Sequence, residues 1–284
     1  MPEGHTLHRL ADGLRARFAG RHVAVSSPQG RFADAAALLD GTLLHDAQAW
    51  GKQLFVEFDG GRFVQVHLGL IGAFDLYDGA APPPRGAVRL RLEATDEPAS
   101  YGDLRGATVC ALLTADQRQA VVDRLGPDPL RDDADWTAAW ARIARSKKPV
   151  GALLMDQSVL AGVGNVYRAE LLYRHRMHPH RPGHTLRRSQ FEAMWHDLVA
   201  LMREGVVSGR IDTVRPEHTP EAMGRPPRVD DHGGEVYVYR RNGQPCLVCG
   251  ASVRTEVLEG RNLFWCPRCQ PRFRSRAGAV RPSA

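Results

Sequence analysis

The pattern of apolar and polar residues divides the chain into a strand-rich first part and a helical second part. Directly behind the N-terminus the apolar residues recur at helical spacing and Gly20 follows as a stop, which predicts an amphipathic helix. From about residue 21 to residue 113 the apolar residues alternate in short runs bounded by Gly, Pro or Asp. This predicts a β-sandwich or barrel with the helix packed on it. The expected strands lie at 22–27, 43–50, 52–59, 62–69, 73–79, 87–94 and 107–113.

Helical periodicity replaces the strand pattern after residues 125–129, where two prolines and a glycine form the expected hinge. A helix is predicted from about Asn165 through Tyr173, behind a glycine-rich loop at 156–164. The amides at the start of this helix are expected to bind a phosphate. Asn165 could cap the helix or contact the phosphate itself.

Two further helices are predicted around this segment. Trp136, Trp140 and Ile143 share one helical face. Ser189 and Glu192 have the spacing of a capping box. The helix that they begin is expected to end at Gly205, since glycine commonly follows the last helical turn.

Four of the five cysteines form two C-x2-C pairs separated by sixteen residues. Thiolates at this spacing are typical of one tetrahedral, structural Zn2+ site. The alternative of two disulfides is disfavoured because no signal peptide precedes the chain and Cys110 stands alone among apolar residues. Between the pairs the residues alternate and turn at 259–262, which predicts a two-stranded ribbon with Arg261 at its tip. The predicted zinc ligands are Cys246, Cys249, Cys266 and Cys269.

Positive charge is concentrated on this zinc ribbon. Residues 237–276 contain eight arginines and two glutamates, a balance of +6, which equals the net charge of the whole chain. Such a concentration is the electrostatic footprint of a nucleic-acid contact. A solvated basic tail is the alternative, mainly from Arg274 onward.

The composition is that of an ordinary globular protein, with 43% hydrophobic and 25% charged residues. No apolar run approaches membrane-spanning length and the N-terminus has no targeting pattern, so we expect a cytoplasmic protein that is not associated with a membrane. A length of 284 residues favours two domains in addition to the ribbon.

Two positions carry candidate chemistry. Removal of Met1 would leave Pro2 as a secondary amine, and an α-amino group is partly unprotonated near neutral pH, so it can act as a nucleophile. Glu3 beside it could move protons. Lys52 is one of three lysines among 38 basic residues, which favours a need for a compact, titratable amine there. Many chains begin with Met-Pro by chance, so the spacing alone leaves this interpretation open.

The separated motifs, taken in order, resemble the formamidopyrimidine-DNA glycosylase/endonuclease VIII family. The MPEGHT opening is most similar to the actinobacterial endonuclease VIII-like DNA glycosylases, and the resemblance covers roughly residues 1–273. The motifs that carry it are MPEGHTLHR, WGKQLFVEF, QVHLGLIG, LGPDPL, DQSVLAGVGNVYRAELLYRHRMHP, VYRRNGQPC and GRNLFWCPRCQ.

The resemblance implies an α+β multidomain protein. The expected parts are an N-terminal helix plus β-sandwich catalytic domain at 1–125, a helix-two-turn-helix DNA-binding domain at 126–232, a zinc ribbon at 233–273 and a tail at 274–284. It also implies a bifunctional DNA glycosylase and abasic-site lyase of base excision repair, acting on damaged double-stranded DNA as a monomer. The expected location is the bacterial cytoplasm, in association with the nucleoid.

The family's functional residues are carried over motif by motif. Pro2 would attack C1′ of the damaged nucleotide and form an iminium, and Glu3 would be its acid/base. Lys52 would lie near the target phosphate and assist base excision. The backbone would then be nicked by β,δ-elimination. His67, Asn165 and Arg261 would contact DNA phosphates, and Leu70 and Arg105 would intercalate.

Three departures from the family pattern favour oxidised pyrimidines over oxidised purines. Thr6 stands where formamidopyrimidine glycosylases usually have a second glutamate, Gly106 and Ala107 replace an expected aromatic wedge, and residues 216–235 do not match a purine-capping loop. Two alternatives stay open: the same chemistry with a preference for 8-oxoguanine or formamidopyrimidine, and a non-catalytic binder of damaged DNA.

Overall fold

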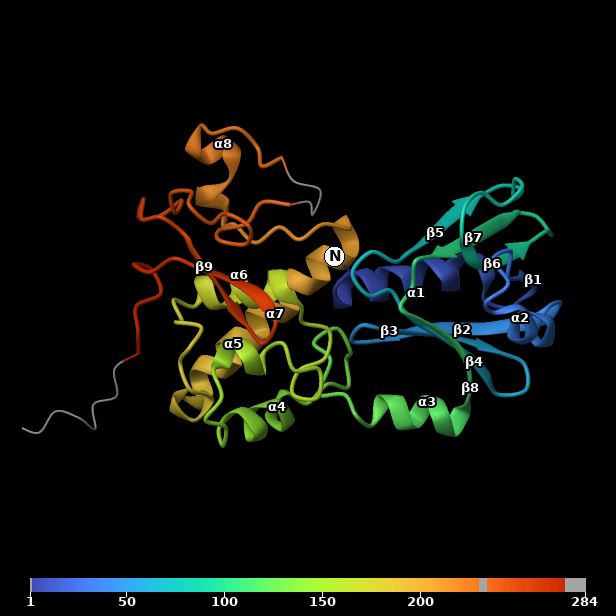
Figure 1. Cartoon of the computed structure of the whole chain (residues 1–284), viewed down its shortest axis with the longest axis horizontal. Helices are drawn as coiled ribbons and strands as arrows, with labels where there is room; N and C mark the ends of the chain where they lie inside the picture. Colours follow the sequence, from blue (N-terminus) through green and yellow to red (C-terminus); the bar gives the residue numbers. More distant parts are fainter. Residues whose placement is uncertain (1, 230–233, 274–284) are drawn as a thin grey trace, which may run out of the picture.

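The computed structural model describes residues 2–229 and 234–273, so Met1, Arg274 and the predicted tail at 274–284 lie outside the described residues. The chain forms two lobes: a β lobe, and a helical lobe that carries the ribbon (Figure 1). The first helix, α1 (Gly4–Phe18), begins at the junction of the two lobes. The expected α+β multidomain fold is confirmed.

Helix α1 packs against both lobes. One side lies against strands β2 and β3, and the other contacts helix α7 of the helical lobe. Leu7, Leu14 and Phe18 are buried in the core of the β lobe, as their helical spacing predicts. The residues that precede α1 are therefore held at the lobe junction.

The β lobe is a sandwich built from one antiparallel sheet that folds over on itself. The strand order is β5-β7-β6-β1-β2-β3-β4-β8. Residues 21–23 of β1 pair with β2 and residues 24–26 pair with β6, so β1 belongs to both layers. The strands are β1 (Arg21–Ser26), β2 (Thr42–Trp50), β3 (Gln53–Phe58), β4 (Arg62–His67), β5 (Ala73–Asp78), β6 (Val88–Ala94), β7 (Ser100–Arg105) and β8 (Val109–Thr114).

The seven predicted strands are confirmed, but sequence analysis missed two elements of this lobe. Strand β7 contains Gly102 and Asp103, which disguise its alternation. Asp103 is nevertheless buried, because its carboxylate accepts two hydrogen bonds from the Arg91 guanidinium at 2.6 and 2.8 Å. The short helix α2 (Ala33–Leu39) was also missed because it buries little more than Ala36 and Leu39.

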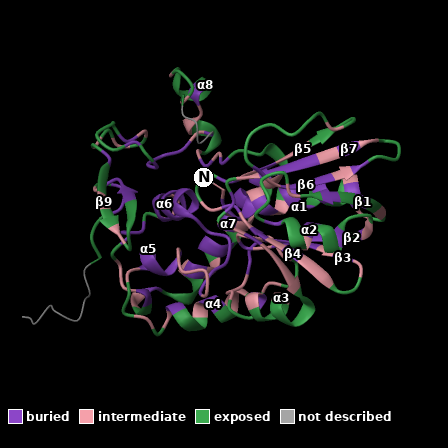
Figure 2. Cartoon of the chain, turned by 45° about the vertical axis from the view of Figure 1, so that its right-hand side comes forward, coloured by how far each residue is buried: buried purple, intermediate pink, exposed green. Residues whose placement is uncertain are grey.

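The helical lobe and the ribbon share one hydrophobic core. Residues of α6 and α7 pack in it together with Tyr237, Tyr239 and Phe264. Figure 2 shows α6 coloured as buried. The helices are α3 (Ala115–Val122), α4 (Trp136–Ile143), α5 (Val150–Leu153), α6 (Asn165–Arg174), η1 (Gly183–Thr185), α7 (Arg188–Ser208), η2 (Pro216–His218) and α8 (Pro220–Met223), and the ribbon strands are β9 (Arg254–Leu258) and β10 (Arg261–Trp265).

The predicted bounds of α7 were wrong at both ends. The helix begins at Arg188, and Gln190 accepts the Arg187 N–H at 3.1 Å, so the capping interaction lies two residues before the predicted one. Gly205 does not end the helix, which continues to Ser208 before Gly209 takes the left-handed conformation. Gly205 is needed for packing, because a Cβ there would lie 2.5 Å from the Tyr167 hydroxyl.

The ribbon prediction is confirmed. Leu258 pairs with Arg261 across a two-residue turn, in which Glu259 and Gly260 have φ of 50° and 69°. Arg261 is the first residue after this turn and is exposed. Among the described helices, none combines the length and the apolar character needed to span a membrane.

Candidate active site and metal centre

The Glu3 carboxylate lies against the N-terminus of α6, where the two lobes meet. It accepts the N–H groups of Gly164 at 2.8 Å, Val166 at 2.8 Å and Tyr167 at 3.4 Å. These donors are free at the start of a helix and the helix dipole favours an anion there. The prediction that these amides bind a phosphate was wrong, because Glu3 occupies them.

Glycine permits this close approach. A Cβ on Gly164 would lie 2.3 to 2.6 Å from atoms of the Glu3 side chain. The adjacent Gly4 N–H donates to the Gly162 carbonyl at 2.8 Å. The glycine-rich loop before α6 therefore receives the N-terminal segment, which is a use of its glycines that the sequence did not reveal.

Lys52 lies in the two-residue turn between β2 and β3. Trp50 and Gln53 close this hairpin, and Gly51 has φ of 58°. The turn reaches the same loop as Glu3, since a Cβ on Gly51 would lie 2.9 Å from the Gly162 nitrogen. Two segments that are distant in sequence thus converge in front of α6.

Burial and charge couple Glu3 to Lys52. Glu3 is fully buried, and burial raises its pKa although the Lys52 ammonium and the α6 amides act in the opposite direction. Burial lowers the pKa of Lys52; Glu3 opposes this effect, whereas Arg261 and Arg168 add to it. The pKa values of the two groups are thus shifted toward each other, as is common for acid/base groups in active sites.

Pro2 is half-buried and lines a cavity of about 800 Å3. Thr6, Leu68 and Phe74 line the same cavity, between α1 and the loop that follows β4. The cavity is large enough for a small ligand and has more apolar than polar wall. An amine at Pro2 would therefore face a space in which a substrate can bind.

His67 ends β4 with a defined tautomer. Its Nδ1 accepts the Gly69 N–H at 3.1 Å, so the neutral ring carries its proton on Nε2. Burial, followed by the Lys52 charge, lowers the pKa of His67. The half-buried ring can thus donate one hydrogen bond to an acceptor such as a phosphate oxygen.

The loop after β4 presents two apolar side chains to solvent. Leu70 is 52% exposed and Ile71 is 87% exposed. Leu70 therefore does not belong to the hydrophobic core. Sequence analysis named Leu70 but not Ile71, although the run of two apolar residues between Gly69 and Gly72 was a visible signal.

Arg105 lies at the end of β7 and is already paired. It contacts the carboxylates of Asp103 at 2.8 Å and Asp75 at 3.5 Å, and its side chain is 32% exposed. An intercalating role would require it to leave these partners. Its ion pairs therefore oppose the predicted intercalation of Arg105, whereas the exposed Ile71 side chain would not have to break an ion pair.

Asn165 begins α6 and does not cap it. Its Nδ2 donates to the Asn262 carbonyl of the ribbon at 2.9 Å, and its Oδ1 accepts from Arg168. Arg168 is fully buried and also donates to the Asn262 carbonyl, at 3.1 Å. These bonds place Arg261, the residue before Asn262, beside the start of α6.

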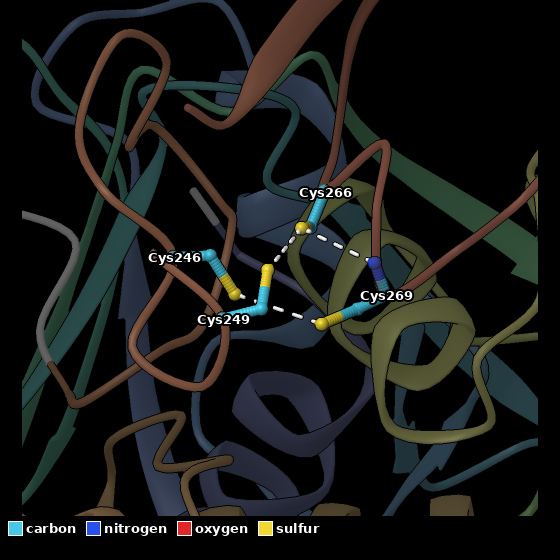
Figure 3. A group of neighbouring side chains, drawn as sticks. All are labelled: Cys246, Cys249, Cys266 and Cys269. Carbon is cyan, nitrogen blue, oxygen red and sulfur yellow. Dashed lines mark hydrogen bonds between the residues drawn. The ribbon is translucent and has the colours of Figure 1, made fainter. Parts of the chain in front are cut away.

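The four predicted metal ligands lie together. Their sulfur atoms are all within 4.8 Å of one another and point toward one centre (Figure 3). A tetrahedral zinc site with Zn–S bonds of about 2.3 Å requires sulfur atoms about 3.8 Å apart. The Cys246–Cys269 and Cys249–Cys266 pairs are 3.9 and 3.4 Å apart, so the cluster fits such an ion.

The cluster is attached to the helical lobe by polar contacts. The Tyr173 hydroxyl on α6 lies 3.1 Å from the Cys246 sulfur, where it can donate to a thiolate. Gln270 accepts the Cys266 N–H at 2.9 Å and donates to the Met177 carbonyl at 2.9 Å. Formation of the metal centre is therefore linked to the position of the ribbon.

Comparison with known proteins shows the origin of this arrangement. Residues 1–110 match the formamidopyrimidine-DNA glycosylase N-terminal domain, residues 125–215 match its H2TH domain, and residues 243–272 match the zinc finger found in FPG and IleRS. Endonuclease 8 1 of Mycobacterium tuberculosis is 55% identical over 275 residues, which cover 95% of this chain and all of that protein. The chain belongs to the formamidopyrimidine-DNA glycosylase/endonuclease VIII family. Members of this family are DNA glycosylases with abasic-site lyase activity, so the expected enzyme class is confirmed.

More distant members of the family agree in sequence or fold. Formamidopyrimidine-DNA glycosylase of Thermus thermophilus is 31% identical over 239 residues, which cover 82% of this chain and 85% of that protein. The Lactococcus lactis formamidopyrimidine-DNA glycosylase, solved with DNA containing an abasic site, has the same fold with a TM-score of 0.74 at 21% identity. That match covers 95% of this chain and all of the other.

Sequence reasoning missed three buried charged residues of this family site. Glu170 on α6 accepts the N–H groups of Tyr237, Val238 and Tyr239 at 2.7 to 2.9 Å. Arg168 and Asp128 are likewise buried. The signal for Glu170 and Arg168 was a charged residue inside an otherwise apolar helix, because such a residue needs a buried partner. Asn165 lies one helical turn before Arg168, but the Asn262 carbonyl and the 237–239 amides lie far away in the sequence and could not be named as partners.

The first testable prediction concerns His5, which follows the active-site segment. Burial lowers the pKa of His5 from 6.5 to about 4. His5 therefore binds a proton more readily in the unfolded chain. Its contribution to the free energy of unfolding is fully present above about pH 6.5 and is lost as the pH falls toward 4. The full loss is about 3 kcal/mol.

His5→Phe should weaken this acid sensitivity. Urea unfolding of both proteins at pH 7.5 and pH 5 measures it, because the difference at pH 7.5 reports the contacts of the neutral ring with Tyr167 and Thr6. An unchanged pH dependence in the variant would show that His5 is not the group responsible.

Proposed function

We propose that this chain removes oxidised pyrimidines from double-stranded DNA and then cleaves the backbone, using Pro2 as its nucleophile. The observation that carries the proposal is the placement of the N-terminal segment: Glu3 is anchored to α6 beside Lys52, and Pro2 lines the adjoining cavity. The titratable pair and the free space lie where the two lobes meet. The family's chemistry requires this combination of groups.

The proposed reaction begins after removal of Met1. The Pro2 nitrogen attacks C1′, the bond from C1′ to the base breaks, and the base leaves with the electron pair and takes up a proton. Glu3 protonates O4′ as the sugar ring opens, which leaves an iminium between Pro2 and C1′. Covalent catalysis of this kind divides one difficult displacement into easier steps.

Strand cleavage follows from the electronic effect of the iminium. It makes the C2′ proton acidic, and loss of that proton expels the 3′ phosphate in β-elimination. A second proton loss, from C4′, expels the 5′ phosphate in δ-elimination. Hydrolysis then releases Pro2 and leaves a gap of one nucleotide. Lys52 is assigned to the base-removal stage, where its ammonium lies near the target phosphate and beside Glu3.

The DNA is proposed to bind across the lobe junction. His67, Asn165 and Arg261 are assigned to phosphates, because they lie around Lys52 and Glu3 at the ends of β4, α6 and the ribbon turn. Leu70 is assigned to the vacancy left by the flipped nucleotide. Arg105 keeps its proposed role as a second intercalating residue only if DNA displaces it from Asp103.

The ribbon is proposed to hold one structural Zn2+ through Cys246, Cys249, Cys266 and Cys269. Fewer than eight arginines of the ribbon can contact DNA, because Arg241 is buried and donates to the Tyr237 and Pro245 carbonyls. The exposed Arg261 is the residue best placed to contact DNA. We further propose that the enzyme acts as a monomer.

Borohydride trapping tests the central proposal. Duplexes with an abasic site, 5-hydroxyuracil or 8-oxoguanine should yield a covalent adduct with the wild-type chain, because an amine forms an iminium that borohydride reduces, and peptide mapping of the adduct should place the DNA on the Pro2 nitrogen. Most adduct on 5-hydroxyuracil would support the pyrimidine preference, and most on 8-oxoguanine would favour the alternative substrate class. Intact-mass analysis confirms removal of Met1. A fully processed chain that gives no adduct would favour a non-catalytic DNA binder.

The exposed apolar tip gives a second prediction. Leu70→Ala and Ile71→Ala should each reduce the trapping rate on a lesion duplex about tenfold, because an apolar wedge offsets the cost of unstacking the DNA. Trapping on a single-stranded abasic oligonucleotide is the control, since it contains no stacked duplex to fill. Equal losses on both substrates would contradict the wedge assignment.

The cysteine cluster gives a third prediction. Removal of zinc by a chelator should abolish DNA binding, because thiolate sites contribute folding free energy directly and the ribbon positions Arg261. Native mass spectrometry should find one zinc ion in the wild-type chain and in Cys110→Ala, and none in Cys249→Ser. Unchanged affinity of the metal-free protein would disprove this role of the ion.

A further inference from the structure

A buried carboxylate lies behind the active site, in the segment that joins the lobes. Asp128 is 2% exposed and precedes Pro129. Its Oδ2 accepts the Gly51 N–H at 2.7 Å and lies 2.7 Å from His8 Nε2. Its Oδ1 accepts the Leu130 N–H at 3.0 Å. Both carboxylate oxygens are therefore engaged.

These three partners come from three different parts of the site. Gly51 is the residue before Lys52 in the hairpin turn, and His8 belongs to α1, which begins directly after Glu3. Leu130 belongs to the connection to the helical lobe. The Asp128 side chain thus connects α1, the Gly51–Lys52 turn and the segment that joins the two lobes.

The hydrogen bond from Gly51 to Asp128 fixes the orientation of the Gly51–Lys52 turn. The pairing of β2 with β3 ends at Trp50 and Gln53, so the Gly51 N–H projects outside the strand ladder. Gly51 is buried, and a buried N–H without a partner is unfavourable, so the turn keeps the orientation in which Asp128 accepts it. That orientation fixes the backbone from which the Lys52 side chain extends.

We propose that Asp128 is a positioning residue that holds the Gly51–Lys52 turn against α1 so that Lys52 faces Glu3. The proposal deepens the proposed function and rests on its assignment of Lys52. Small displacements of a catalytic group cost large factors in rate, so this anchor should affect base removal without touching DNA.

The surroundings of Lys52 provide a readout that does not depend on catalysis. Glu3 faces Lys52 from the N-terminal segment, His67 from β4, Arg168 from α6 and Arg261 from β10. Burial is the main reason that the pKa of Lys52 is lowered. If the turn is released, the ammonium moves toward water and its pKa should rise.

The chain is suited to this measurement because Lys52 is one of only three lysines. After reductive methylation with 13C-formaldehyde, NMR can follow each lysine through a titration, and Lys52→Arg identifies the signal of Lys52. In Asp128→Asn we expect the Lys52 midpoint to move to higher pH. Loss of a negative charge alone would move it to lower pH, so a rise reports release of the turn.

A double-mutant cycle tests the effect on reaction. Asp128→Asn should slow base removal from a lesion duplex by about tenfold or more, and should add less than about twofold in a Lys52→Ala background, because both changes act through one group. Strand cleavage at a preformed abasic site should change little in either. Asp132→Asn is the matched control, since this exposed residue of the same connection pairs with Arg203 at 3.3 Å.

Asp128→Glu keeps the carboxylate and serves as a second variant, with thermal unfolding measured for all proteins. It should recover most of the rate lost in Asp128→Asn. An unchanged Lys52 titration together with the same rate loss in both backgrounds would overturn the proposal. A raised Lys52 midpoint with no loss of base removal in Lys52→Ala would support the positioning role and contradict the catalytic assignment of Lys52, so the two failures are distinguishable.

Discussion

The contact between the Glu3 carboxylate and the first amides of α6 is the interaction on which the site depends. It satisfies donors that a helix leaves free and places a buried negative charge at the positive end of the helix dipole. The contact also joins the lobes, because Glu3 precedes α1 of the β lobe while α6 lies in the core of the other. Together with the bond from the Gly4 N–H to the Gly162 carbonyl, it fixes the N-terminal segment relative to the loop before α6.

The same helix organises the ribbon from its other end. Glu170 accepts three backbone N–H groups from the segment that leads into the cysteine cluster, and Tyr173 reaches the Cys246 sulfur. Each of these hydrogen bonds is buried, so breaking one would leave a polar group without a water partner and would cost free energy. Helix α6 therefore relates the position of the cysteine cluster to that of Glu3.

Local patterns predicted much of the fold and the four cysteines that converge in the ribbon. The α1 periodicity, the alternating strands and the C-x2-C pairs are local signals, and each is confirmed by the structure. Strand β7 was missed because its buried Asp103 depends on Arg91, a partner from another strand. The predicted end of α7 was wrong because Gly205 is required for packing against Tyr167 and does not end the helix. No local sequence pattern contains that contact.

In the candidate site, too, a local pattern identified the loop but a long-range contact determines its use. The glycine-rich loop before α6 was interpreted as a phosphate cradle, which is a sound use of a helix N-terminus. In the structure an internal carboxylate takes that place. The anion that a helix terminus binds can thus belong to the protein itself. Only the long-range contact to Glu3 distinguishes the two cases, and one sequence cannot display it.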